Sequence, residues 1–275
     1  MTVPDVDLAG LADVEETTPL INALTNNVTT NDVAQVIRHW GGLPVMSDDE
    51  REVADMVAGA QALLLNMGTV SETGEAAMMA AGRAANEAGV PVVLDPVGVG
   101  ATPTRDRVGE RLAGDLDVSI VNGNHGEIAA LTGQDAEVRG VESVGEYADI
   151  AETAIACARE YGAVVVASGE TDVVATEAAA YEVQTGHEMM STVVGTGCML
   201  GATLATVAGA IDDAERASLL GTAAFGLAGE AAAEGAFGDY QGPASYQIAF
   251  RDAIAGLREA NPDSPRSRIR QVVEA

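Results

Sequence analysis

The feature that most constrains the fold is an alternation, over the first two thirds of the chain, between short apolar runs and segments of helical periodicity. Strands that alternate with helices favour a mostly parallel central sheet with helices on both faces, so we predict an α/β fold. The predicted helices in the intervals include Thr30–Trp40, Glu50–Gly59, Ser71–Ala88 and Glu146–Tyr161. Eight runs have the composition of strands: Leu20–Leu24, Leu43–Met46, Ala62–Leu65, Pro91–Asp95, Val118–Val121, Ala163–Ala167, Val173–Thr176 and Ala179–Val183.

The pattern changes after the predicted strand Ala163–Ala167. The next two predicted strands leave no room for a crossover helix between them, so they should form an antiparallel hairpin. The tail Asn261–Ala275, with two prolines and three arginines, is expected either to be loosely held or to cover a subunit surface. No linker or fixed repeat interrupts residues 1–275, which we predict to form a single domain. The C-terminal third is predicted to be helical over 197–209, 214–234 and 242–257.

A glycine-rich turn runs directly into a small-residue helical segment at Val194–Ala202. Gly195 and Gly197 can adopt positive φ angles and let a ligand approach the main chain, and the free N–H groups of the first helical turn attract anions. The turn therefore predicts a phosphate site, with a simple helix cap as the alternative. Cys198 lies where the same field favours a thiolate, although it is also suited to fill space beneath the glycines.

Two carboxylates are predicted to meet at the ligand-binding edge of the sheet. Asp95 ends an apolar strand and is followed by a Pro/Gly loop. Further along, a second strand ends in a polar turn containing Asn124, and Glu127 opens the next helix. Because strand carboxyl ends face the ligand crevice of an open α/β sheet, the two side chains could share one hard cation such as Mg²⁺. Alternatively, Asp95 caps a turn and Glu127 interacts with a helix dipole.

Taken together, these motifs resemble the hydroxyethylthiazole kinases, a family of the ribokinase-like superfamily. The resemblance covers almost the whole chain. Cys198 is the discriminating residue, because most ribokinase-like kinases place an aspartate there. The further motifs that carry the resemblance are Thr25-Asn26-Asn27-Val28 with Asn31, Pro44-Val45-Met46, Leu65-Asn66-Met67-Gly68-Thr69, Asp95-Pro96-Val97-Gly98-Val99-Gly100-Ala101-Thr102, Glu127-Ile128-Ala129-Ala130-Leu131 and Gly186-His187.

The resemblance implies a ribokinase-like fold and an activity. The protein would use ATP and Mg²⁺ to phosphorylate the hydroxyl of 5-(2-hydroxyethyl)-4-methylthiazole, in thiamine biosynthesis by salvage. It also implies a homotrimer in which the thiazole lies between subunits.

Roles for individual residues follow from the same resemblance. Cys198 would meet the substrate hydroxyl, as a base or as a positioning group, and Asp95 and Glu127 would hold Mg²⁺ directly or through water. The thiazole would be bound by Asn26, Met46, Gly68 and Gly195. The nucleotide would be bound by Asn122, Ser168, Gly195, Thr196 and Gly197.

Departures from the family's pattern cluster on the nucleotide side. Asn122 stands where an arginine is usual, Thr192 where a basic residue is frequent, and Ser168 where a threonine is usual. The first two remove positive charge that would meet the phosphates. We hypothesise that potassium and magnesium ions supply the missing charge.

Composition indicates an unusual solvent. Forty-two acidic residues oppose 14 basic ones, giving a formal net charge of −28, and every basic residue is an arginine. Such a surface needs dense counterion screening, which favours a protein of a salt-accumulating halophile over an acidic mesophilic protein. Nucleic acid and anionic membranes are unsuitable partners for this charge. The N-terminus lacks the features of a signal peptide, so we expect a cytoplasmic protein.

Two other readings stay open. One is a different ribokinase-like enzyme, either a hydroxymethylpyrimidine-type kinase or a nucleotide-dependent hydrate dehydratase. Cys198 and the Thr25-Asn26 segment argue against both. The other is a regulator that binds thiazole or nucleotide without turnover.

Overall fold

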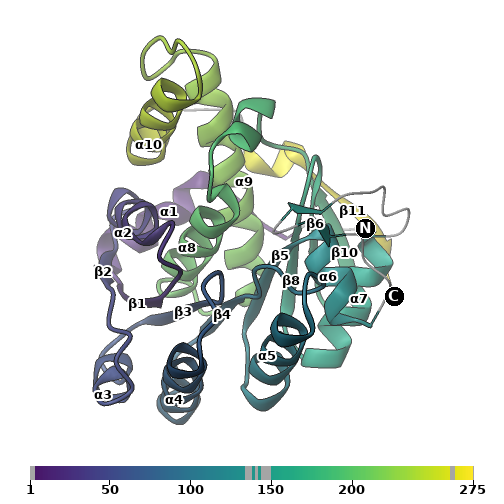
Figure 1. The fold of residues 1–275 in the computed structure, drawn as a ribbon. Coiled ribbons are helices and arrows are strands. Elements are labelled where there is room, and N and C mark those ends of the chain that lie inside the picture. Colours follow the sequence, from purple (N-terminus) through teal and green to yellow (C-terminus); the bar gives the residue numbers. More distant parts are fainter. Residues whose placement is uncertain (1–3, 134–137, 140–141, 144–149, 261–263, 275) are drawn as a thin grey trace.

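The computed structural model describes residues 4–133, 138–139, 142–143, 150–260 and 264–274. Its centre is a nine-stranded sheet in the order β11-β10-β9-β8-β5-β4-β3-β1-β2 (Figure 1). The six strands β8, β5, β4, β3, β1 and β2 pair in parallel with their neighbours. The pairs β8–β9, β9–β10 and β10–β11 are antiparallel. The nine strands are β1 Leu20–Leu24, β2 Leu43–Val45, β3 Ala62–Asn66, β4 Val92–Asp95, β5 Ile120–Asn124, β8 Val164–Ser168, β9 Asp172–Ala175, β10 Ala179–Val183 and β11 Ile269–Glu274.

Helices cover both faces of this sheet, which confirms the predicted α/β layering (Figure 1). The side chains of β3 show why the strand is apolar throughout: Leu64 packs into one core, and Leu63 and Leu65 into the other. The α-helices are α1 Leu11–Thr17, α2 Thr30–His39, α3 Val53–Val57, α4 Glu72–Ala88, α5 Pro103–Asp115, α6 His125–Leu131, α7 Ile150–Tyr161, α8 Thr196–Ala208, α9 Ala214–Ala233 and α10 Pro243–Ala260. Two short strands, β6 Val138–Arg139 and β7 Glu142–Ser143, form a separate antiparallel pair.

The helical C-terminal third is confirmed, and α8 is its central element. Every residue of α8 from Cys198 to Ala208 is buried, which explains why the helix consists of small and apolar residues. It contacts β3, β4 and β5 along the middle of the sheet. Its N-terminus therefore lies at the edge where the parallel strands end. The other long helices of this third, α9 and α10, pack against each other.

Eight of the nine strands overlap the eight predicted runs, and β9 and β10 form the predicted antiparallel hairpin. The largest offset is at β5, which runs from Ile120 to Asn124 rather than from Val118 to Val121. The helix predicted over Glu50–Gly59 is limited to Val53–Val57. Residues 146–149 of another predicted helix lie outside the described residues. Among the described residues, no helix is both long and apolar enough to span a bilayer.

The expectation of a loosely held tail is wrong for residues 264–274. Ile269–Glu274 forms β11, which pairs antiparallel with β10 at the edge of the sheet. Arg268 anchors the start of this strand, because its guanidinium pairs with Glu230 of α9 (2.7 Å) and also donates to the Gln184 carbonyl (2.8 Å). The side chain of Ile269 is buried as well. One ion pair and one apolar anchor thus fix a segment whose prolines suggested a free end.

Candidate active site

The carboxyl ends of the parallel strands bring polar residues from distant parts of the chain to one edge. Asn66 at the end of β3 is the register partner of Asp95 at the end of β4. Asn124 at the end of β5 pairs in the same way with Ser168 of β8. Gly195, the residue before α8, meets the same edge, because α8 packs across these strands. The predicted convergence of the strand ends and the glycine turn is present.

Buried hydrogen bonds connect Asp95 to Cys198 through two asparagines. Asn66 Nδ2 donates to Asp95 Oδ2 (2.6 Å). Asn66 Oδ1 accepts from Asn26 Nδ2 (2.9 Å), and the same Asn26 nitrogen lies 3.4 Å from the Cys198 sulfur and 2.8 Å from Thr29 Oγ1. Both amides are almost fully buried. Because each amide is held at both ends, the line fixes the thiol relative to the Asp95 carboxylate.

Asn66 is a site residue that the sequence patterns did not single out. It belongs to a motif of the resemblance, yet only its neighbour Gly68 was given a role. The available signal was a polar residue that ends the apolar run Leu63–Leu65, as Asp95 ends its own strand. Gly68 is close to Asn26, because a Cβ built on it would lie 2.8 Å from the Asn26 Cβ. This contact brings together two of the residues predicted to bind the thiazole.

The surroundings of Cys198 favour the protonated thiol over the thiolate. Burial raises the pKa of the thiol to about 11, and the charge of Asp95 adds to the increase. Hydrogen bonds from Asn66, Thr29 and Asn26 act in the opposite direction but are smaller effects. The sequence leaves two roles open for Cys198, a base or a positioning group, and desolvation of the sulfur favours the second because it opposes a thiolate at this helix N-terminus.

Glu127 is held by the backbone around it. Its Oε1 accepts from the Gly98 N–H (2.6 Å) and its Oε2 from the Asn124 N–H (2.8 Å), while Asn124 Oδ1 accepts from the Glu127 N–H (3.0 Å). The last two bonds form a capping box at the start of α6. Burial nevertheless raises the pKa of Glu127 to about 7, in spite of these bonds. Glu127 therefore lies in the first turn of α6, as the helix-dipole alternative to metal binding expects, and it also completes the capping box. Its hydrogen bonds do not fully offset the cost of burying its charge.

The group around Asp95 and Glu127 fits a divalent cation. Burial raises the pKa of Asp95 well above its usual range, and the charge of Glu127 raises it further. Nearby, Asn122 Oδ1 is buried without a hydrogen-bond partner, while its Nδ2 donates to the Gly197 carbonyl (3.2 Å). Hard oxygen atoms of this kind are the donors that Mg²⁺ prefers, with water completing its shell. No cluster of three or more His, Cys, Asp or Glu side chains suited to a metal occurs in the described ranges.

The turn before α8 has the shape expected of an anion site. Gly195 has φ +86°, and a Cβ there would lie 2.3 Å from Thr29 Cγ2, so only glycine fits. A Cβ built on Gly197 would meet nothing within 4 Å, which leaves its main chain open to a ligand. The Thr196 hydroxyl donates instead to the Met190 and Val193 carbonyls (2.8 and 2.7 Å). Thr196 thus offers its backbone, rather than its hydroxyl, to an anion.

Two other predicted site residues lie at the periphery of this cluster. Met46 follows β2, is partly buried and packs against the core on the α8 side of the sheet. Ser168 ends β8, and its hydroxyl donates to the Gly123 carbonyl over 3.4 Å. Neither has a hydrogen bond to the line from Asp95 to Cys198. The structure therefore brings together Asp95, Asn122, Cys198, Asn26 and Gly68 more closely than it does these two.

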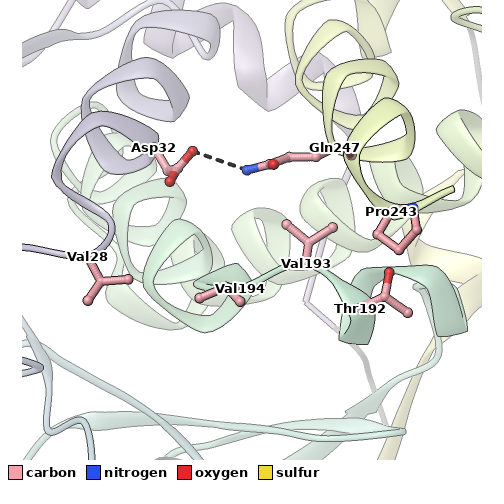
Figure 2. Close-up of a pocket in the computed structure, with 8 residues that line it drawn as sticks. Val28, Asp32, Thr192, Val193, Val194, Pro243 and Gln247 are labelled. Carbon is pink, nitrogen blue, oxygen red and sulfur yellow. Dashed lines mark hydrogen bonds between the residues drawn. The ribbon is translucent and has the colours of Figure 1, made fainter.

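A cavity of about 350 Å³ opens beside the glycine turn, between the start of α2 and the start of α10. Figure 2 shows Val28 and Val194 on one side and the hydrogen bond from Gln247 to Asp32 (3.2 Å) across its far side. Val28 and Val194 are 73% and 74% exposed. Of the residues predicted to bind thiazole, none lines this cavity, although Val194 is adjacent to Gly195.

Comparisons with known proteins agree with one another. The model of the hydroxyethylthiazole kinase family matches residues 11–260. A protein named hydroxyethylthiazole kinase from Natronomonas pharaonis is 64% identical over 271 residues, which cover 98% of this chain and 96% of that protein.

Solved structures extend the similarity to the fold. A hydroxyethylthiazole kinase protein from Pyrococcus horikoshii matches with a TM-score of 0.85 and 30% identity, covering 97% of this chain and 98% of that one. A ribokinase-like superfamily protein from Enterococcus faecalis matches with a TM-score of 0.61 and 10% identity over 95% of this chain and 92% of its own. The second match concerns the fold alone, and the fold predicted from the sequence is confirmed.

Proposed function

The chain belongs to the hydroxyethylthiazole kinase family, and on that premise we propose that it transfers the γ-phosphoryl group of ATP to the hydroxyl of 5-(2-hydroxyethyl)-4-methylthiazole in thiamine salvage. The observation that carries the proposal is the buried line from Asp95 through Asn66 and Asn26 to Cys198, which ends at an open helix N-terminus. Such a line would place an alcohol, a carboxylate and an anion site next to one another.

The side chains orient the alcohol more than they activate it. Since the pKa of Cys198 is about 11, its thiol keeps its proton at neutral pH and serves as a positioning group for the hydroxyl. The reaction does not require a thiolate base, because phosphoryl transition states are often loose and little proton transfer precedes bond formation. Asn26, with Gly68 packed against it, holds the thiazole side of the substrate.

The donor phosphates meet main-chain N–H groups rather than cationic side chains. The first turn of α8 directs its free N–H groups and its helix dipole to the strand ends, and the open approach at Gly197 admits a phosphate. Asn122 and Ser168 border the same edge. In this proposal the γ-phosphoryl group lies between Gly197 and the alcohol beside Cys198.

Asp95 and Glu127 would hold Mg²⁺, and Asn122 Oδ1 is a further oxygen available to it or to its water shell. When bound, the ion neutralises charge that develops on the phosphates. Asp95 and Glu127 also keep their own positions without it, because Asn66 donates to the first and two backbone N–H groups donate to the second.

The proposal includes a homotrimer and a requirement for high salt. Val28 and Val194 expose large apolar side chains at the cavity, and Ile248, the residue after the lining residue Gln247, exposes a third. A second copy of the chain would cover them. We expect light scattering to give the mass of a trimer in molar KCl. Val194→Asp should lower the measured mass. A monomer at all concentrations would contradict this part. The net charge of −28 makes molar salt the expected working solvent.

The test is to mix the protein with ATP, Mg²⁺ and hydroxyethylthiazole in molar KCl and to follow phosphothiazole by mass. Glu127→Ala should abolish the product, whereas Glu87→Ala, which changes an exposed glutamate of α4, should not. A folded protein that makes no product contradicts the proposal. Stabilisation by thiazole or ATP without product would then support a binding regulator, and turnover of a hydroxymethylpyrimidine alcohol would support a different kinase.

A further inference from the structure

Arg105 lies in the first turn of α5, next to the loops that follow β3 and β4. Its guanidinium donates to the carbonyls of Met67 (3.0 Å) and Gly68 (2.9 Å), which follow β3, and to the carbonyl of Val97, which follows β4. These two loops are 29 residues or more apart in the chain. One side chain therefore ties the loop that carries Gly68 to the loop that follows Asp95.

The contacts of Arg105 differ from those of its neighbours on the same helix. Arg107 and Arg111 both pair with the carboxylate of Glu75 (3.0 and 2.7 Å), on the side of α5 that faces α4. The guanidinium bonds of Arg105 go to main-chain carbonyls instead. A carboxylate would bind the guanidinium more strongly than these carbonyls do. Because Arg105 donates to carbonyls at two strand ends instead, its role is to fix the geometry of those strand ends.

The contact reaches the metal side of the site through Gly98. A Cβ built on Gly98 would lie 3.0 Å from Arg105 Cδ and 3.1 Å from Nη1, so the arginine packs directly on this residue. The Gly98 N–H in turn donates to Glu127 Oε1 (2.6 Å). Displacement of the guanidinium would free both Gly98 and the carbonyl of Gly68. These residues flank the carboxylates on one side and the thiazole on the other.

We infer that Arg105 is a positioning residue for phosphoryl transfer, which holds the acceptor loop at Met67–Gly68 in register with the metal loop at Val97–Gly98. The inference rests on the proposed function. The planar, five-donor guanidinium suits this task, because its donors point to different carbonyls at fixed angles. A lysine has a single mobile ammonium group and cannot hold both loops in one orientation. Misplacement of reacting groups by about 1 Å costs about 100-fold in rate.

The experiment compares Arg105→Gln and Arg105→Lys with Arg107→Gln, a control on the same helix that lies outside the site. We expect Arg105→Gln to lower kcat/KM for the thiazole by about 100-fold and to raise the Mg²⁺ concentration for half-maximal rate, with Arg105→Lys only partly active. Arg107→Gln should lose no more than about twofold, although it also loses an ion pair. Methylguanidinium added to Arg105→Ala should restore part of the rate.

Thermal unfolding is measured for each variant, so that a loss of folded protein is separated from a loss of rate. The inference is overturned if kcat/KM of Arg105→Gln lies within about twofold of that of Arg107→Gln, or if Arg105→Lys is fully active. A wild-type protein that makes no product contradicts the proposed function instead. Amide hydrogen exchange then tests the role of Arg105 without any measurement of activity. Faster exchange at Gly98 in Arg105→Gln supports the inference that Arg105 holds the two loops in register, and unchanged exchange overturns that inference.

Discussion

The acceptor side of the candidate site, at the ends of β1, β3 and β4, differs from the donor side, at the ends of β5 and β8. On the acceptor side, the amides of Asn26 and Asn66 are buried and bonded at both ends. On the donor side, Asn122 Oδ1 is buried without a partner, and Ser168 has one long bond of 3.4 Å. The protein therefore fixes the geometry of the proposed acceptor side with its own side chains, whereas the proposed donor side keeps a buried oxygen that a nucleotide or its cations would use.

The charges show the same difference. One cationic side chain supports the acceptor side, because Arg105 donates to carbonyls of the loops that follow β3 and β4. At the donor side, Asn122 is neutral, and the proposed anion-binding groups are those of the backbone at Gly195–Gly197. Thr192, which is also neutral, lines the cavity beside the glycine turn. In a protein of net charge −28, phosphates bound at this proposed site would meet side chains that offer little positive charge. This is the physical basis for our hypothesis that bound Mg²⁺ and potassium supply it.

The largest effect is expected from removal of the carboxylate of Asp95, which ends β4 on the acceptor side. Asp95→Asn should lower kcat by about 1,000-fold, because the charge that would hold the cation is lost. The same change should leave the protein at least as stable at pH 8, because burial raises the pKa of Asp95 and an ionised carboxyl there opposes folding. Steady-state kinetics and thermal unfolding check both statements. An active Asp95→Asn enzyme would contradict the metal assignment.

The next effect tests whether the acceptor line is continuous. Asn66→Leu should lower kcat by about 100-fold, because Asp95 Oδ2 and the Asn26 amide both lose a partner and the thiol is no longer fixed. Asn86→Leu is the matched control: its amide also makes two hydrogen bonds, to the backbone of Asp117, but it lies outside the site. Equal losses of kcat in the two variants would mean that Asn66 contributes only to stability.

A third prediction concerns pH and Mg²⁺. Glu127 has a pKa of about 7 in the fold, above its unfolded value of 4.5, so its contribution to stability is greatest below the unfolded value and falls as pH rises through 7. Asp172, with a pKa of about 7, acts in the same pH range but lies outside the proposed metal group.

Bound Mg²⁺ must displace the protons on Asp95 and Glu127, so its gain in Tm should be larger at pH 8 than at pH 5.5. Asp95→Asn should reduce that gain, whereas Asp172→Asn should not. A gain in Tm that is the same at both pH values would contradict the assignment of Mg²⁺ to these carboxylates.

The smallest effect is expected at Cys198. Because its thiol is protonated, Cys198→Ser should change kcat by less than about tenfold, below the 100-fold or more that accompanies loss of a general base. The pH profile of kcat between pH 6 and 9 should keep its shape in the variant. A wild-type ionisation near pH 8 that disappears in Cys198→Ser would show that the thiol acts as a base after all.

The sequence allowed the prediction of much of the fold and of the chemistry that lies within single motifs. Alternating apolar runs located eight strands, and Asp95 and Gly195 were identified because each terminates or begins an element. Asn66 and Arg105 were missed because their importance lies in contacts with residues tens of positions away, which local patterns do not encode. Whether Cys198 acts as a base or as a positioning group stayed open for a similar reason. Its pKa depends on burial by the whole fold, whereas the sequence displays only the adjacent helix start.

The central claim is that the acceptor side is built before the nucleotide arrives. The most direct measurement is calorimetric titration of hydroxyethylthiazole into the protein in molar KCl without ATP or Mg²⁺, followed by titration of ATP with and without Mg²⁺. We predict that the thiazole binds to the free protein and that Mg²⁺ strengthens the binding of ATP by about tenfold or more. Thiazole that binds only after ATP and Mg²⁺ are present would contradict the claim.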